Sequence, residues 1–238
     1  IESNGTIFTI ENILDFEITD TSINPLEKCQ KLLAGREYEN LVATGYGRHL
    51  AASHFGNNVV TEIKAYAQGA HFLYPDTQSV IDIGGQDSKA IRMDDQGRVD
   101  DFAMNDKCAA GTGRFLEAMA RALQVDIDTM GAMDKGATQN LTLSSMCTVF
   151  AESEVVSLIA DGAEVGEIVR GLNRSIAART VGLVKRISPN LRGVKVAMSG
   201  GVARNQGVIR ALSEALACPI AVPAEPDTIG ALGAALIA

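Results

Sequence analysis

Two short motifs in the sequence place paired glycines directly after an apolar strand. The first runs from Asp82 to Asp87, reads Asp-Ile-Gly-Gly-Gln-Asp, and follows the apolar pair Val80-Ile81. Paired glycines let backbone N–H groups approach an anion without a Cβ in the way. An aspartate at such a point can hold hydrated Mg²⁺ near phosphates. A hairpin turn flanked by surface acids fits the same residues, so both interpretations stay open at this point.

The second motif runs from Ser199 to Asn205 and reads Ser-Gly-Gly-Val-Ala-Arg-Asn. Here too an apolar strand meets two glycines, and a helix is expected to follow. Strand, glycines and helix N-terminus together predict an anion or nucleotide pocket. The spacings G-x-G-x-x-G and G-x-x-x-x-G-K-[ST] are both absent, so neither the dinucleotide fingerprint nor a P-loop applies. A plain tight turn into a helix is the alternative.

Two further motifs carry a cysteine just before a predicted helix. In residues 105–115 Cys108 precedes the small-residue turn Gly111-Thr112-Gly113, and in residues 145–154 Cys147 occupies the same kind of position. The amino end of a helix stabilises negative charge, so a cysteine there favours the thiolate form that binds metal. The turn after Cys108 could also face a phosphate. Buried, inert cysteine is the more common environment and remains an alternative.

Two thiolates do not complete a metal centre. A cubane iron–sulfur cluster usually takes four ligands, and so does structural zinc. The three histidines lie far from both cysteines in the sequence. A symmetric dimer in which each chain supplies Cys108 and Cys147 provides four sulfurs around a two-fold axis. The cluster would then lie at the surface between subunits, where an electron can leave toward a partner.

The other two cysteines are predicted to be structural. Cys29 falls in a short amphipathic helix, and Cys218 ends a helix before Pro219. The wide spacing of all four cysteines does not resemble a secreted disulfide framework. We therefore expect a reducing, cytoplasmic location.

The elements that position these motifs alternate between strands and helices, which predicts an α/β protein. Strands are expected over residues 6–10, 13–18, 40–44, 79–83, 88–93, 98–104, 194–198 and 220–222. Helices are expected over residues 25–33, 61–73, 112–123, 149–159, 165–187, 205–217 and 229–238, with Asn24 capping the first. The change of character near Cys108 predicts an N-terminal lobe of residues 1–107 and a C-terminal lobe of residues 108–238.

The bulk composition is that of a globular protein with an aliphatic core. Of 238 residues, 46% are apolar and 21% charged, while aromatic residues make up 5% and Trp is absent. The net charge of −8 repels phosphate backbones and argues against a nucleic-acid partner. No apolar run is long enough to span a bilayer, so no membrane partner is expected. The sequence begins with Ile1 and ends within a helical pattern, and we expect it to belong to a longer chain.

At these motifs the sequence resembles the activators of 2-hydroxyacyl-CoA dehydratases and the ATPase subunits of benzoyl-CoA reductase, the BadF/BadG/BcrA/BcrD ATPase family. The resemblance covers nearly the whole chain from about Gly45 onward. The matching strings are residues 43–48, 80–89, 104–115, 147–154, 199–205 and 230–235. The two cysteine strings are the most specific, and they make the cluster the favoured interpretation.

The resemblance implies the two-lobed fold of acetate and sugar kinases, Hsp70 and actin, with ATP between the lobes. It implies a homodimer that shares one 4Fe–4S cluster on Cys108 and Cys147. ATP binding and hydrolysis would swing the helices that begin near Gly111 and Val149. One electron would pass at low potential to a partner enzyme with its own iron–sulfur clusters, and a low-potential ferredoxin or flavodoxin would be the electron source.

The same resemblance assigns residues to the nucleotide. Those expected to line the phosphates are Gly84, Gly85, Gln86 and Asp87, with Gly111, Thr112 and Gly113 close by. Those expected to flank the adenosine are Glu152, Gly200, Gly201, Val202 and Asn205. Asp82 is expected to hold hydrated Mg²⁺, and Asp82 and Gln86 are the candidates for direct catalytic roles.

One family feature has no counterpart here. Family members open with a strand that ends in Asp-x-Gly-Ser, the first phosphate loop, and nothing in residues 1–20 matches it. Cluster ligation is therefore a firmer expectation than ATP turnover by these 238 residues. Two alternatives share the fold: a small-molecule kinase without a cluster, and a non-catalytic nucleotide switch that acts through partners.

Overall fold

A computed structural model describes residues 2–8, 13–21, 23–55, 58–139, 141–143, 147–188 and 194–238, with the backbone alone for residues 2–8. Its centre is a five-stranded sheet in the order β7-β6-β5-β8-β9. The strands are β5 (Ser79–Ile83), β6 (Ser88–Met93), β7 (Val99–Asn105), β8 (Val196–Ser199) and β9 (Ile220–Ala221). β6 runs antiparallel to both of its neighbours, whereas β5, β8 and β9 are mutually parallel.

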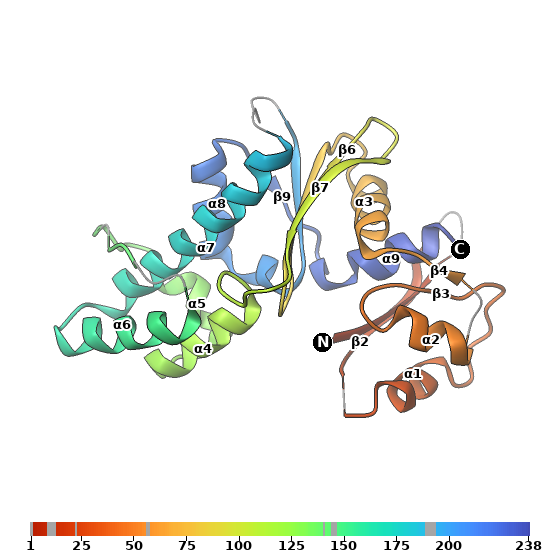
Figure 1. The fold of residues 1–238 in the computed structure, drawn as a ribbon, viewed down its shortest axis with the longest axis horizontal. Coiled ribbons are helices and arrows are strands. Elements are labelled where there is room, and N and C mark those ends of the chain that lie inside the picture. Colours follow the sequence, from red (N-terminus) through yellow and green to blue (C-terminus); the bar gives the residue numbers. More distant parts are fainter. Residues whose placement is uncertain are drawn as a thin grey trace.

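Helices cover both faces of this sheet. α7 and α8 lie on one side of it and α3 and α9 on the other (Figure 1). The bounds are α3 (Glu62–Leu73), α4 (Gly113–Leu123), α7 (Val165–Ile187), α8 (Gln206–Leu216) and α9 (Ile229–Leu236). This arrangement explains why the consecutive residues Val80 and Ile81 of β5 are both apolar rather than alternating with polar ones.

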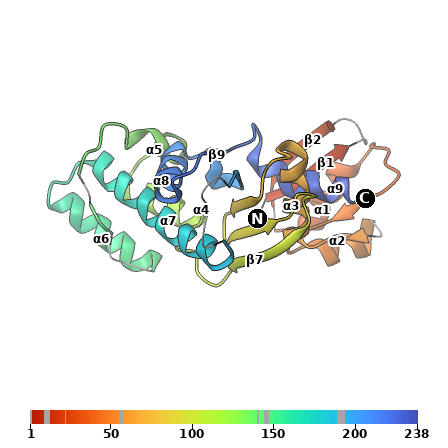
Figure 2. The same ribbon diagram turned by 90° about the horizontal axis from the view of Figure 1, so that it is seen from above.

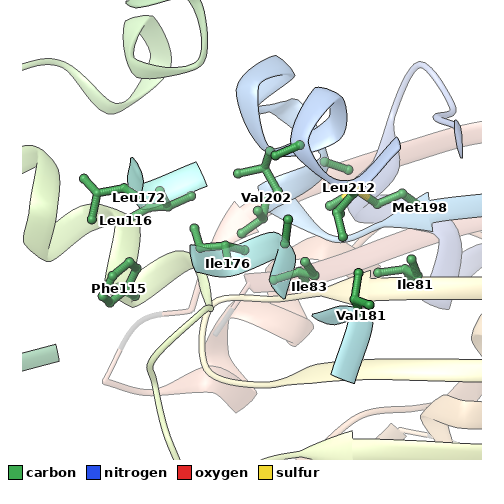
Figure 3. Close-up of a cluster of buried hydrophobic side chains, with 14 of the residues drawn as sticks. Ile81, Ile83, Phe115, Leu116, Leu172, Ile176, Val181, Met198, Val202 and Leu212 are labelled. Atoms are coloured by element: carbon green, nitrogen blue, oxygen red, sulfur yellow. The ribbon is translucent and has the colours of Figure 1, made fainter. Parts of the chain in front are cut away.

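Successive residues of β5 point into two different hydrophobic cores. Ile81 and Ile83 belong to the larger core with α4, α7 and α8, while Val80 belongs to the smaller core with α3 and α9. In Figure 3 the labelled side chains of Ile81 and Ile83 lie among those of the larger core. Because both faces are covered, every residue of β5 is buried, including the acidic residue Asp82.

The helices that follow the sheet hairpin form one end of an elongated molecule (Figures 1 and 2). α5 (Ile127–Met133) follows α4, and α6 (Thr148–Ala160) packs on both α4 and α7. None of the described helices is both long enough and apolar enough to cross a membrane.

Helices α3 and α9 cross with their backbones in direct contact. A Cβ built on Gly233 would lie 1.7 Å from the carbonyl oxygen of Ala65, and one on Gly69 would lie 2.2 Å from that of Ile229. No side chain larger than hydrogen fits at either position. The two helices can therefore cross this closely only because both positions are glycine.

The N-terminal part is built from small elements. β1 (Glu2–Phe8) pairs antiparallel with β2 (Ile13–Asp20), and β3 (Val42–Ala43) pairs parallel with β4 (Asn58–Val59). The helices here are α1 (Pro25–Leu33) and α2 (Arg48–Phe55), and two single 3-10 turns occur later at Gly201–Arg204 (η1) and Pro226–Thr228 (η2). Asn24 caps α1 as predicted, since its side chain accepts a hydrogen bond from Glu27 N at 3.3 Å.

Several predicted elements match the structure residue for residue, namely 25–33, 79–83, 88–93 and 165–187. The strand predicted over 40–44 has only two residues, and residues 9 and 10 of the first predicted strand lie outside the described part. α2 and α5 were not predicted. Strands from both sides of the predicted lobe boundary at residues 107/108 share the five-stranded sheet; the division into 1–107 and 108–238 stays a prediction.

Candidate functional site

The two glycine motifs meet because β5 and β8 are parallel neighbours. Asp82 pairs with Ser199 at the ends of these strands, and the Ser199 hydroxyl donates to Asp82 Oδ1 at 2.9 Å. Gly200 has φ of +83°, and a Cβ there would lie 2.4 Å from the carbonyl oxygen of Ile83. Both loops therefore leave the carboxyl edge of the sheet side by side, where open α/β sheets bind their ligands.

The turn after Cys108 joins the first glycine loop through hydrogen bonds. Gly113 N donates to the carbonyl of Gly84 at 2.9 Å, and Arg114 N donates to that of Gly85 at 2.9 Å. The Thr112 hydroxyl also reaches the Gly85 carbonyl, at 3.0 Å. The turn thus lies beside the predicted phosphate loop, and the first amides of α4 bind the carbonyls of that loop.

At the tip of this loop, Gly85 and Gln86 are exposed, while Asp87 is buried. The Gly84 amide closes the turn by donating to the Asp87 carbonyl at 3.0 Å. Tyr46, which is exposed, donates from its hydroxyl to Asp87 Oδ2 at 3.5 Å. An exposed glycine-rich tip over a rigid base is the geometry that a phosphate contact needs.

Beneath the loop, one ammonium group holds three carboxylates. Lys89 Nζ lies 3.1 Å from Asp82 Oδ2, 2.7 Å from Asp87 Oδ1 and 3.8 Å from Glu62 Oε2. The side chain of Lys89 is only 2% exposed, and its Nζ lies 5.5 Å from the ring centroid of Tyr66. The cluster ties β5, the loop, β6 and the first turn of α3 together.

This cluster has more negative than positive charge. Burial, together with the nearby carboxylates of Asp87 and Asp82, raises the pKa of Glu62 despite Lys89. Burial also raises the pKa of Asp82, against the opposing effect of Lys89. Although burial alone would lower it, the surrounding carboxylates raise the pKa of Lys89, so the ammonium stays charged. Both carboxylate oxygens of Asp82 are already bound, Oδ1 by Ser199 and Oδ2 by Lys89. The assignment of hydrated Mg²⁺ to Asp82 stays a prediction.

The predicted adenosine residues divide into two groups. Gly200, Gly201, Val202 and Asn205 lie together around η1, and Asn205 Oδ1 caps α8 by accepting from Gly207 N and Val208 N at 2.9 and 3.1 Å. The Nδ2 of Asn205 is buried and has no hydrogen-bond partner among the described residues. Glu152 is exposed on α6, and within the described part no hydrogen bond or ion pair links it to this group.

The two predicted cluster ligands are the exposed cysteines. Cys108 follows β7, and its carbonyl accepts from Asn105 Nδ2 at 3.0 Å; Cys147 is the N-cap residue of α6. By contrast, Cys29 is half-buried and Cys218 is buried, and burial raises the pKa of both thiols. Residues 145 and 146 of the Cys147 motif lie outside the described residues.

Among the described residues of one chain, no group of three or more His, Cys, Asp or Glu side chains is arranged so that it could hold a metal ion. Cys147 is the N-cap residue of α6, and Cys108 lies in the loop five residues before α4 begins at Gly113. These two helices pack on each other. This donor set fits a cluster only if a second chain provides the remaining sulfurs.

Sequence reasoning missed Lys89, Glu62, Ser199 and Tyr46 as parts of the site. Lys89, inside the predicted strand 88–93, was an available signal, because a buried lysine needs partners. Glu62 gave no such signal, since an acidic residue in the first turn of a helix is common on any surface.

Comparison with known proteins identifies related sequences. The model of the "BadF/BadG/BcrA/BcrD ATPase family" matches residues 26–238. The chain is 49% identical to an activator of lactoyl-CoA dehydratase from Anaerotignum propionicum over 199 residues, 83% of this chain and 74% of that protein. It is 44% identical to a 2-hydroxyisocaproyl-CoA dehydratase activator from Clostridioides difficile over 206 residues, 87% of this chain and 76% of that protein.

A solved structure of similar fold is the activator of the 2-hydroxyisocaproyl-CoA dehydratase from Clostridium difficile with bound ADPNP. It superposes with a TM-score of 0.88 at 38% sequence identity, over 100% of this chain and 94% of that one. The predicted two-lobed ATPase fold of the acetate and sugar kinase, Hsp70 and actin type is thereby confirmed.

Proposed function

The chain belongs to the BadF/BadG/BcrA/BcrD ATPase family, and on this premise we propose that it is an ATP-dependent one-electron donor. It would activate a 2-hydroxyacyl-CoA dehydratase or a benzoyl-CoA reductase-type enzyme. The observation that carries the proposal is the exposure of two cysteines beside helices that pack together: Cys108 lies in the loop that leads into α4, and Cys147 is the N-cap residue of α6.

The nucleotide side of the proposal rests on the convergence of the glycine loops. Gly84 and Gly85 would offer the phosphates an exposed tip beside the turn of Gly111 to Gly113. The segment from Gly200 to Asn205 would hold the adenosine, and Glu152 would join it as α6 moves. The negative excess around Asp82 supports Mg²⁺ as the companion of ATP or ADP, with Gln86 exposed toward the reacting phosphate.

The iron–sulfur cluster is proposed because thiolates are its usual ligands and a cubane cluster takes four of them. Two chains of a homodimer would each contribute Cys108 and Cys147 to one 4Fe–4S cluster. When bound, the cluster supplies one electron at low potential. A ferredoxin or flavodoxin of low potential would provide that electron, and an iron–sulfur cluster of the partner enzyme would accept it, while ATP and water become ADP and phosphate.

The surface next to Cys147 supports contact with another chain. Val149 is 66% exposed and Phe150 is 67% exposed, both in the first turn of α6. Neighbouring large apolar side chains that face solvent often mark a surface that a partner covers. The thiols would thus lie within an interface, in a cytoplasmic setting where they stay reduced.

Anaerobic reconstitution with iron and sulfide tests the proposal. We expect about four irons for every two chains, and a brown protein that elutes as a dimer. Either Cys108→Ser or Cys147→Ser should abolish iron binding, while the matched variant Cys29→Ser, which changes a half-buried thiol, should retain it. Full iron content in the first two variants would refute the assignment of the ligands.

Reduction of a partner enzyme tests the activity itself. With ATP and dithionite, the loaded protein should reduce a dehydratase of this class, and it should fail to do so without ATP. A colourless protein that phosphorylates a metabolite after purification in air would instead identify the small-molecule kinase of the same fold.

A further inference from the structure

The hydroxyl of Thr112 lies between the glycine loop and the loop of Cys108. Thr112 is fully buried, and its Oγ1 is 3.0 Å from the carbonyl oxygen of Gly85 and 2.7 Å from that of Ala109. A hydroxyl group has one proton to donate. It can therefore make a full hydrogen bond with only one of these two carbonyls at a time.

Structural roles do not account for this hydroxyl. Thr112 occupies the N-cap position of α4, yet its side chain makes no capping hydrogen bond. Both carbonyls also have a backbone partner already: Ala109 O accepts from Thr112 N at 3.0 Å, and Gly85 O accepts from Arg114 N at 2.9 Å. Removing the hydroxyl would leave neither acceptor unsatisfied, so its loss should cost little stability.

The two carbonyls belong to loops with different assigned roles. Gly85 is at the exposed tip that we assign to the phosphates. Ala109 follows Cys108 directly, and the Cys108 carbonyl is tied to the end of β7 by Asn105 Nδ2 at 3.0 Å. A small movement of either loop changes which carbonyl is the better acceptor for the single proton.

We propose that Thr112 is a positioning residue that couples the phosphate loop to the loop of Cys108. A nucleotide-dependent shift of Gly85 rotates the Thr112 O–H bond, so that its hydrogen bond changes between the carbonyls of Gly85 and Ala109. The loop of Cys108 is held differently in the two states. No covalent bond forms or breaks. This inference rests on the proposed function, since it assumes nucleotide at one loop and a cluster at the other.

The test compares how fast a chelator removes iron from the full-length, cluster-loaded protein with saturating ADP and with a non-hydrolysable ATP analogue. The two rates should differ for the wild type. Thr112→Val keeps the shape of the side chain and removes the hydroxyl. In this variant the ratio of the iron-loss rates with the two nucleotides should fall toward one by roughly three- to tenfold, because one hydrogen bond is worth about that factor when it is present in only one state. Thr112→Ser should restore the ratio.

Thr180→Val is the matched control. Thr180 is also buried, and its hydroxyl donates to the Ile176 carbonyl, at 3.1 Å, within α7. This variant should keep the wild-type ratio. If Thr112→Val does not fold, the pair Thr112→Ser and Thr112→Ala, which differ only in the hydroxyl, makes the same comparison.

The outcomes separate the two proposals. A wild-type ratio retained in Thr112→Val, or lost equally in Thr112→Ser, would overturn the coupling role and leave the proposed function intact. A wild type that binds no iron, or loses iron at one rate with both nucleotides, would count against the proposed function itself.

Discussion

At the scale of single residues, the site depends on how buried charge is balanced. Lys89 is almost completely buried, which is costly for an ammonium group unless carboxylates and hydrogen bonds replace its water. Asp82 and Asp87 provide those contacts at 3.1 and 2.7 Å, and Glu62 adds a third charge at 3.8 Å. The position of the glycine loop therefore depends on one lysine that belongs to the neighbouring strand.

Replacing Lys89 by methionine should be strongly destabilising. The variant leaves Asp82 and Asp87 buried without their cation, and removal of one partner from a buried ion pair typically costs about 3–5 kcal/mol. Urea unfolding at pH 7 measures the loss. The loss should shrink at lower pH, where Asp82 takes up a proton because burial raises its pKa.

Lys31→Met is the control for this variant. Lys31 also pairs with a carboxylate, that of Glu27 at 2.7 Å, but both side chains are largely exposed. Its removal should leave the urea midpoint essentially unchanged. Equal losses in the two variants would show that the buried cluster contributes nothing specific.

Glu62→Gln should stabilise the protein at neutral pH. Because burial raises the pKa of Glu62 in the folded state, its ionised form costs stability at a pH above that raised pKa, and this cost disappears near the ordinary value of 4.5. The gain in urea midpoint should therefore be present at pH 7 and vanish as the pH falls toward 4.5.

Glu27→Gln is the control, because its effect on stability should have the opposite sign to that of Glu62→Gln. The exposed Lys31 beside it lowers the pKa of Glu27, so the ionised form is favoured in the folded state above the ordinary range. The urea midpoint of this variant should be slightly lower than that of the wild type at pH 7. A Glu62→Gln variant that is less stable than the wild type at pH 7 would contradict the sign derived for Glu62.

At the scale of elements, α3 and α9 cross in close contact. The crossing places helix backbones within reach of one another at Gly69 and Gly233. Glu62 lies in the first turn of the same α3, so the crossing also positions one carboxylate of the charged cluster. A displacement of α9 would therefore also displace α3 and the Glu62 carboxylate beneath the glycine loop.

Gly233→Ala should destabilise the fold by at least about 3 kcal/mol, because the added methyl would overlap the Ala65 carbonyl and force the helices apart. Gly182→Ala is the matched control, since Gly182 lies on the exposed face of α7 and its added Cβ would meet nothing within 4 Å. That control should gain roughly 0.5–1 kcal/mol from the better helix propensity of alanine. Thermal unfolding of both variants measures the difference, and similar midpoints would disprove the tight crossing.

The sequence predicted those elements whose local signals agree with their tertiary environment. Asn24 and Pro25 mark the start of α1, and the apolar residues Val80, Ile81 and Ile83 mark β5, which is buried on both faces. α2 was missed because none of its residues is buried, so it carries no apolar stripe. The link between Glu62 and Lys89 was missed because it joins residues that only the folded chain brings together.

At the scale of the whole molecule, the central sheet separates two hydrophobic cores and carries the site at one edge. The larger core joins β5 and β8 to α4, α7 and α8, and the smaller one joins them to α3 and α9. The glycine loops follow β5 and β8, each of which contacts both cores. The site could be assigned to this edge from the motifs. The homodimer expected from two cysteines per chain stays a prediction, because one folded chain does not show the assembly.

The burial of β5 on both faces has a consequence for amide exchange. Hydrogen exchange in a strand between two cores requires the whole domain to unfold, whereas an exposed turn exchanges by local opening. The amides of residues 80–83 should thus be among the slowest to acquire deuterium, while those of Gly85 and Gln86, only two and three positions beyond, exchange early. Mass spectrometry of deuterated peptides would measure this step in protection, and a gradual change along the strand would contradict it. The loop proposed to contact the nucleotide would then open and close many times before β5 unfolds once.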